Sequence, residues 1–226
     1  MQRIPEKELM DGEDQARAYA GADFDVPHDY FISLFQEAFP GYALSGAVAD
    51  LGCGPGDISM RFARRYPDCM VHGVDGSQAM LSLGAGLVGS MPELDGRVRL
   101  IHGYLPGAEM PLGKYGAVIS NSLLHHLNDP LTLWRAITDL AQEGAPVFVM
   151  DLMRPRDRDE AARIVDLYMY DEPRILKADF FNSLLAAYEP DEVRRQLESA
   201  GLGDFTLREV SDRHLAVWGI ASGSGR

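Results

Sequence analysis

Three glycines and two aspartates lie close together early in the chain and form its most informative pattern. Gly52, Gly54 and Gly56 alternate with other residues, and Asp50 and Asp57 flank them. A short apolar run precedes the glycines and an amphipathic stretch follows them, which predicts a strand, a tight turn and a helix. Glycines let the backbone of such a turn adopt positive φ and let a ligand approach the main chain. The first N–H groups of the helix would face that ligand.

The charges around the turn indicate which ligand it binds. A dinucleotide site would have a third glycine at the position of Asp57, where a carboxylate would instead repel a diphosphate. A further acid, Asp75, ends the next predicted strand 19 residues after Gly56, where a carboxylate binds ribose hydroxyls. Asp50 and Asp75 therefore bracket a nucleoside that carries positive charge. S-adenosylmethionine, which has an ammonium, a sulfonium and no phosphate, fits this pattern better than NAD.

Three segments together resemble the signature of class I S-adenosylmethionine-dependent methyltransferases. They are Asp50-Leu51-Gly52-Cys53-Gly54-Pro55-Gly56, Gly73-Val74-Asp75-Gly76-Ser77 and Met80-Leu81. The competing interpretation is that the glycines belong to some other nucleotide-binding α/β turn. The presence of Asp75 at the expected spacing favours the methyltransferase signature over that interpretation. The resemblance implies that S-adenosylmethionine is the cofactor and that these residues hold it: Asp50, Gly52, Gly54, Gly56, Asp75, Gly76, Ser77, Met80, Gly103, Tyr104 and Asn121.

One position departs from the family's pattern. Many relatives have Gly-Asp after the third strand, where the acid meets the adenine amino group, whereas this chain has Gly103-Tyr104. Two alternatives follow for the adenine contact: the Tyr104 ring stacks on or bonds to the base, or the backbone of Gly103 makes the contact.

The candidate catalytic residues are two adjacent histidines that follow the fourth predicted strand. Methyl transfer is an in-line displacement that positioning alone can catalyse, but a hydroxyl or acidic carbon must also lose a proton. An imidazole titrates near neutral pH and can accept that proton. We predict His126 as the proton acceptor, with His125 as the alternative because neighbouring residues of a turn point in different directions. The competing interpretation is that either histidine only packs or faces solvent. The spacing of cysteines and histidines predicts no metal site.

Apolar runs and amphipathic stretches alternate from Ala47 onward, which predicts an α/β fold. We expect a Rossmann-like, doubly wound sheet of seven mostly parallel strands with helices on both faces. The last two strands are joined too closely for a crossover helix, so they should form an antiparallel hairpin. The predicted strands are 47–51, 70–74, 97–102, 115–120, 145–151, 204–210 and 214–220, and the predicted helices are about 57–65, 77–88, 129–142 and 190–200.

The predicted S-adenosylmethionine-binding domain comprises residues 46–153 and 190–221, and two other segments accompany it. Residues 1–45 form an N-terminal helical arm, of which residues 6–20 are polar and are expected to be mobile. Residues 154–189 form a helical insertion that leaves the carboxyl end of a strand, where ligands bind in open α/β sheets.

Both of these segments are predicted to cover an acceptor pocket. Tyr19 of the arm and Tyr168 and Phe181 of the insertion are the residues expected to line it. The competing interpretation is that these aromatic residues pack into the core.

The composition limits the kinds of acceptor molecule and the cellular compartments that are expected for this protein. The chain has 226 residues and a net charge of −13, so it repels a nucleic-acid backbone and favours a small-molecule acceptor. No apolar stretch approaches the ~20 residues that cross a bilayer, and no targeting segment is recognised. Two lone cysteines are typical of a reduced, cytoplasmic protein. The oligomeric state stays open, and a homodimer is compatible with the sequence.

Two other functions share the donor turn. A protein could bind S-adenosylmethionine for regulation or convert the donor itself, and the Tyr104 departure favours this alternative slightly. A nucleotide-dependent oxidoreductase is disfavoured by Asp57 and by the missing third glycine.

Overall fold

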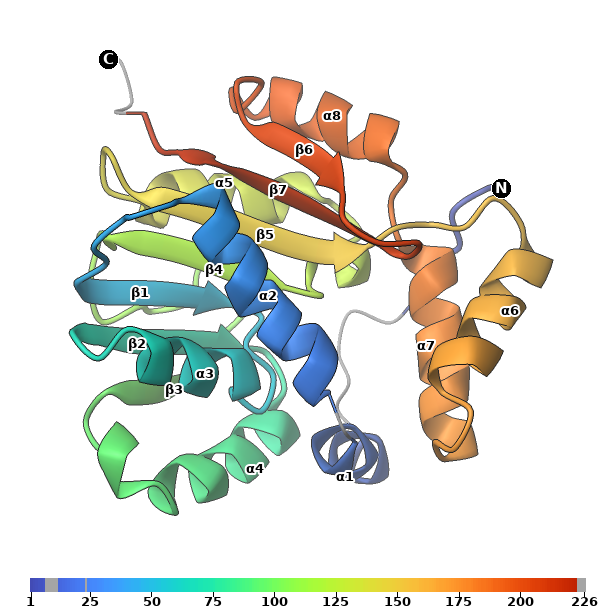
Figure 1. The fold of residues 1–226 in the computed structure, drawn as a ribbon, viewed down its shortest axis with the longest axis horizontal. Coiled ribbons are helices and arrows are strands. Elements are labelled where there is room, and N and C mark those ends of the chain that lie inside the picture. Colours follow the sequence, from blue (N-terminus) through green and yellow to red (C-terminus); the bar gives the residue numbers. More distant parts are fainter. Residues whose placement is uncertain (7–11, 23, 223–226) are drawn as a thin grey trace.

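A computed structural model describes residues 1–6, 12–22 and 24–222. Within these residues, seven strands form one sheet: β1 (Gly46–Leu51), β2 (Cys69–Asp75), β3 (Val98–His102), β4 (Ala117–Asn121), β5 (Pro146–Leu152), β6 (Thr206–Glu209) and β7 (His214–Ile220). Their order is β3-β2-β1-β4-β5-β7-β6 (Figure 1). β7 pairs antiparallel with β5 and β6, and the other neighbours pair in parallel. The predicted α/β fold and its C-terminal hairpin are therefore confirmed.

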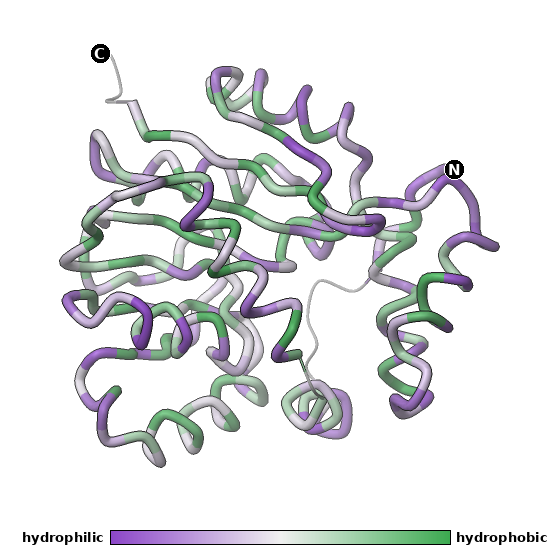
Figure 2. The backbone as a smooth tube through the Cα atoms, viewed as in Figure 1, coloured by the Kyte–Doolittle hydropathy of each residue, from purple (hydrophilic) through white to green (hydrophobic). Residues whose placement is uncertain are grey.

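Helices cover both faces of the sheet and form additional elements beside it. They are α1 (Glu13–Gly21), α2 (Asp25–Ala38), α3 (Asp57–Arg65), α4 (Gln78–Gly89), α5 (Leu131–Leu140), α6 (Arg158–Tyr168), α7 (Arg174–Ala186) and α8 (Pro190–Ser199), with 3₁₀ turns η1 (Pro92–Leu94) and η2 (Leu124–His126). On one face, Phe31 and Phe35 of α2 pack with Phe62 of α3. On the other, Trp134 of α5 packs with Leu197 of α8. Figure 2 shows hydrophobic residues concentrated along the central strands.

Local sequence signals explain where several helices begin. Ser77 caps α4 by accepting a hydrogen bond from the Met80 amide, and Asp157 caps α6. Glu189 and Glu192 form a reciprocal capping box at the start of α8. None of the helices in the described residues is long and apolar enough to cross a membrane.

Part of the N-terminal arm packs against other helices, although its polar sequence predicts a mobile segment. Residues 7–11 of the predicted mobile stretch lie outside the described residues. The following helix, α1, buries Ala16 and contacts both α4 and α7. It therefore lies between the nucleotide half of the sheet and the insertion (Figure 1).

The insertion is a pair of helices with an apolar cluster of its own. α6 and α7 pack together beside the sheet (Figure 1) and share a cluster that includes Ile164 and Leu184. This cluster is distinct from those on the two faces of the sheet. α7 also contacts η2, which places it near the histidine pair.

Candidate active site

The glycine turn between β1 and α3 forms one wall of a cavity of about 1150 Å³. Gly52 has a φ of +73°, and a Cβ at this position would lie 2.8 Å from side-chain atoms of Leu123, so glycine is required. Gly54 has a φ of +54°, and a Cβ there would meet none of the described residues within 4 Å. A ligand in the cavity can therefore approach the backbone of Gly54.

Asp75 holds the glycine turn in place. It ends β2, and its carboxylate accepts hydrogen bonds from the Gly54 amide at 2.8 Å and from the Ser77 amide at 2.7 Å. The sequence predicted a ribose contact for this acid. The structure adds a second role, because the carboxylate ties the turn to the start of α4.

Asp50 is buried at the carboxyl end of β1, where it accepts a hydrogen bond from Ser59 Oγ at 2.6 Å. The pKa of Asp50 is raised to about 7, because burial and the charge of Asp75 outweigh the opposing hydrogen bond from Ser59. A cation in the cavity would favour the ionised form of this carboxyl group. The donor end of the cavity is thus suited to a ligand that carries a sulfonium.

Most of the residues predicted to bind the cofactor line this cavity. They are Asp50, Gly52, Gly54, Asp75, Gly76, Ser77, Met80, Gly103, Tyr104 and Asn121. Gly56 is not among the lining residues, because it caps α3 with a φ of +83° and its α-carbon faces the side chain of Leu100. Gly103 and Tyr104 both line the cavity. The structure is therefore compatible with both alternatives for the adenine contact.

Asn121 offers a buried acceptor at the end of β4. Its Oδ1 has no hydrogen-bond partner among the described residues. A buried carbonyl oxygen without a partner costs ~1–3 kcal/mol, so a donor group of a bound ligand would stabilise it. Together with the open space at Gly54, this orphaned oxygen fits a cavity that holds a polar cofactor.

The histidine pair follows β4 in η2, and its two members have different surroundings. His125 is 3% exposed, and its Nδ1 lies 2.6 Å from Oδ1 of Asp151 at the end of β5. Burial would lower the pKa of His125, but the charge and hydrogen bond of Asp151 and the charge of Glu6 raise it above its ordinary value. His126 is less buried and, like His125, lines the cavity.

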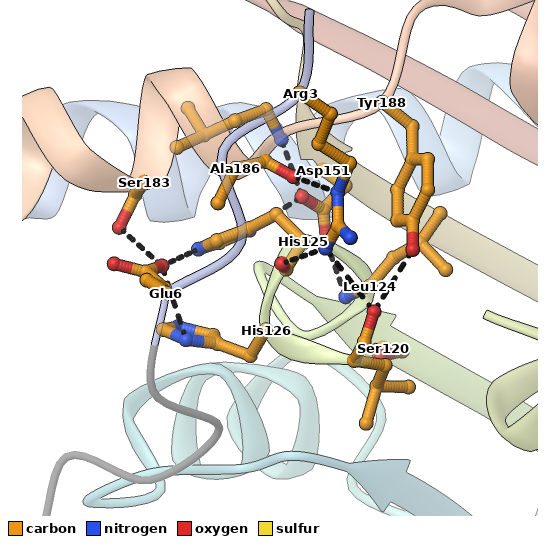
Figure 3. A network of polar contacts seen from close by, with 12 residues as sticks. Arg3, Glu6, Ser120, Leu124, His125, His126, Asp151, Ser183, Ala186 and Tyr188 are labelled. Carbon is orange, nitrogen blue, oxygen red and sulfur yellow. Dashed lines mark hydrogen bonds and ion pairs between the residues drawn. The ribbon is translucent and has the colours of Figure 1, made fainter. Parts of the chain in front are cut away.

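A glutamate from the N-terminal segment lies between the two histidines (Figure 3). Oε1 of Glu6 is 3.2 Å from Nδ1 of His126 and 3.6 Å from Nε2 of His125. It also accepts a hydrogen bond from Ser183 Oγ of α7 at 3.0 Å. Burial raises the pKa of Glu6, while His125 and Ser183 oppose the shift. We call Glu6, His125, His126 and Ser183 the Glu6 cluster.

Arg3 fastens the segment that carries Glu6. Its guanidinium donates hydrogen bonds to the carbonyl oxygens of His125 at 2.9 Å and Leu127 at 3.2 Å, and to that of Ala186. It also stacks 4.1 Å from the centre of the Tyr188 ring. The chain before Glu6 is thus bound to both η2 and the end of α7.

Aromatic residues from three elements cover the rest of the cavity. Tyr19 of α1 packs 4.8 Å from the ring of Phe24, and burial with the nearby Asp57 and Asp75 charges raises its pKa to about 12. Tyr168 of α6 lines the cavity and donates a hydrogen bond to Asp212. The aromatic residue of α7 that lines the cavity is Phe180. Its neighbour Phe181, the predicted residue, packs against the α6–α7 cluster as Phe180 does, but it does not line the cavity.

Asp151, Glu6 and Arg3 are among the residues of this site that the sequence analysis did not predict. Asp151 carries a signal that was available, because it ends a predicted strand next to the fourth one, where polar residues gather at the ligand edge. Glu6 and Arg3 carry no such signal, since their partners are more than a hundred residues away and no periodicity links them. The sequence predicted that the arm covers the pocket through Tyr19, but it did not predict that Arg3 and Glu6 belong to the site.

Comparison with known proteins relates this geometry to a family. A family model of a methyltransferase domain matches residues 48–144. An uncharacterized methyltransferase of Mycobacterium tuberculosis is 26% identical over 152 residues, which cover 67% of this chain and 74% of that protein. A trans-aconitate 2-methyltransferase of Delftia acidovorans is 32% identical over 120 residues, which cover 52% of this chain and 41% of that protein.

A solved structure extends the likeness of the fold to nearly the whole chain. The plantazolicin methyltransferase BpumL in complex with SAH, the demethylated donor, has a TM-score of 0.69 at 13% identity and covers 93% of this chain and 91% of its own. The matched family model spans the glycine turn, Asp75, Asn121 and the histidine pair. The chain is a class I S-adenosylmethionine-dependent methyltransferase, and S-adenosylmethionine is its cofactor.

Proposed function

We propose that the enzyme transfers the methyl group of S-adenosylmethionine to a small-molecule acceptor by in-line displacement. The observation that carries this proposal is that one cavity of about 1150 Å³ contains both the glycine turn and the Glu6 cluster. Sites for single small ligands occupy ~300–1,000 Å³, so this cavity has room for the donor and a small acceptor together. The net charge of −13 further disfavours a nucleic acid as the acceptor.

The names of similar proteins support an acceptor of this size. The Delftia acidovorans relative is named for trans-aconitate. BpumL has been crystallised with a triazolic desmethylPZN analog and SAH. Both names describe acceptors that are not macromolecules, and we extend that class to this chain.

For an acceptor hydroxyl or acidic carbon, we propose that His126 accepts the proton, with His125 as the alternative. His126 is the better candidate because its side chain is less buried, whereas the side chain of His125 is 3% exposed and its Nε2 faces the Glu6 carboxylate at 3.6 Å. As the acceptor atom bonds to the methyl carbon, the carbon–sulfur bond breaks and its electrons stay on sulfur. The acceptor's proton then passes to the imidazole.

We propose that the N-terminal arm and the helical insertion cover the active site. Residues 1–45 would act as a cap and residues 154–189 as a lid over the nucleotide-binding domain of 46–153 and 190–221. Tyr19 and Tyr168 would contact the acceptor, and on the insertion Phe180 is better placed than Phe181. The free cysteines, both buried, support a cytoplasmic location.

Calorimetry and turnover test this function. SAH should bind with micromolar-range affinity, whereas NAD should not bind. Tritiated methyl donor should then label a component of a small-molecule extract, and His126→Ala should lower the labelling rate ~10²-fold without changing SAH affinity. Binding of SAH without labelling of any extract would favour the regulatory alternative, and full labelling by His126→Ala would remove the proposed base.

A further inference from the structure

We propose that Glu6 is a positioning residue that fixes His126 in the form able to accept a proton. The N-terminal segment would then be a working part of the active site and not only its cover. The inference rests on the proposed function in assigning a base, but it stands on contacts of its own.

The first of these contacts sets the protonation pattern of His126. Oε1 of Glu6 lies 3.2 Å from Nδ1 of His126 (Figure 3). The contact has an ion-pair distance but not the alignment of a hydrogen bond, and the negative charge of the carboxylate favours the tautomer in which Nδ1 carries the proton and Nε2 is the acceptor.

A second set of contacts holds Glu6 itself. Ser183 donates to Oε1, and Nε2 of His125 faces that atom from 3.6 Å. His125 is in turn fixed by Asp151 on β5. The cluster thus joins two carboxylate–histidine pairs, one buried and one beside the cavity, through a single oxygen of Glu6.

The charged and titratable groups around the cluster come from several elements, including β7, where His214 interacts with His125 and Asp151. The N-terminal segment contributes Glu6 and Arg3, η2 contributes His125, and β5 contributes Asp151. Asp179 of α7 lines the same cavity and adds a further negative charge near Glu6. Arg3 binds backbone carbonyls instead of the Glu6 carboxylate, so it fixes the segment without neutralising that carboxylate.

The proton balance of the step is simple. When the acceptor's lone pair attacks the methyl carbon, its proton moves to Nε2 of His126 and forms an imidazolium. The carboxylate of Glu6 stabilises that cation in the half-buried site, where an opposite charge counts for more than in water. The imidazolium returns the proton to solvent after the products leave.

The test uses nitrogen NMR of the imidazoles and needs no acceptor. The chain has 6 histidines, and His126→Gln identifies the signal of His126. In the wild-type protein with SAH bound, we expect neutral His126 to carry its proton on Nδ1. In Glu6→Gln its pKa should fall by about one unit or more, because the carboxylate that favoured the imidazolium is gone.

Glu13→Gln is the matched control. It removes a carboxylate of α1 whose side chain is 80% exposed and pairs with Arg17, and it should leave the His126 signal unchanged. An Nε2-protonated His126 in the wild type would overturn the proposal without any variant. An unchanged pKa in a Glu6→Gln protein that still binds SAH would overturn it as well.

Titration with Zn²⁺ gives a third way for the proposal to fail. The ligand atoms of Glu6, His125 and His126 lie within 4.8 Å of one another. Stoichiometric Zn²⁺ binding that Glu6→Gln abolishes would make these residues metal ligands and overturn the positioning role. If the wild-type protein did not bind SAH, the proposed methyl transfer would be contradicted. The tautomer of His126 can be measured without SAH, so the two failures are distinguishable.

Discussion

The Nδ1 atom of His125 lies 2.6 Å from Oδ1 of Asp151, in a pair whose side chains are only 3% and 2% exposed. The other carboxylate oxygen, Oδ2, accepts a hydrogen bond from the Leu124 amide at 2.7 Å. This one aspartate therefore fixes both the backbone of η2 and the first of its histidines. The geometry of the acceptor end depends on it.

Asp151→Asn should destabilise the protein by about 3–5 kcal/mol, because breaking a buried charge pair leaves one partner uncompensated. Urea unfolding measures this, with the exposed Asp166→Asn as control. The raised pKa of His125 adds a pH dependence. Its contribution is fully present below the ordinary histidine pKa and is lost as pH rises through the folded-state pKa. An equal loss in both variants would contradict the structural role of the pair.

Asp75→Ala should weaken SAH binding by about 5- to 150-fold. The variant leaves the Gly54 and Ser77 amides without their carboxylate acceptor, which costs ~1–3 kcal/mol, and also removes the proposed ribose contact. Calorimetry with SAH checks this, and Asp68→Ala, which removes an exposed acid before β2, is the control. Unchanged affinity in Asp75→Ala would exclude both roles.

His214 should make the protein less stable in acid. Burial, together with the charge of Arg213, lowers its pKa to about 4. The unfolded chain takes up this proton near pH 6.5, so the folded state loses up to about 3 kcal/mol as pH falls from about 6.5 to about 4. His214→Asn should flatten the dependence of unfolding free energy on pH over that interval. The exposed His102→Asn should not, and matching slopes for both variants would refute the assignment.

Ligand binding should slow hydrogen exchange in the covers of the site. We expect SAH with an acceptor to protect residues 12–22 and 164–188, because α1 and the α6–α7 pair contribute Tyr19, Tyr168 and Phe180 to the cavity. β1 serves as an internal reference, since its core amides should exchange slowly in either state. Equal exchange in the covers with and without ligands would argue against closure.

The parts of the site that the sequence predicted are those fixed by local backbone requirements. Gly52 is forced by a positive φ and by the contact with Leu123, so the turn has an unmistakable local pattern. The alternation of strands and helices likewise placed Asp75 and Asn121 at one edge of the sheet. These features depend on short segments and on a general rule for parallel sheets.

The remaining parts depend on long-range packing and on the phase of helices. Glu6 meets His126 only because Arg3 binds the carbonyls of η2 and α7, which no local pattern encodes. The choice between Phe180 and Phe181 is a choice of helix face, and both residues are apolar. Strand ends were also less certain: Tyr115, predicted to start the fourth strand, forms only an isolated bridge with Ala141.

The separate apolar cluster of α6 and α7 has a consequence for how this enzyme could diversify. Because the cluster that holds the helical pair, including Ile164 and Leu184, contains Leu152 of β5 but no residue of the glycine turn, substitutions on its cavity side need not disturb that turn. Acceptor preference can then drift while the use of the methyl donor is inherited unchanged. A transplanted α6–α7 pair offers a compact module for redirecting methylation to new compounds.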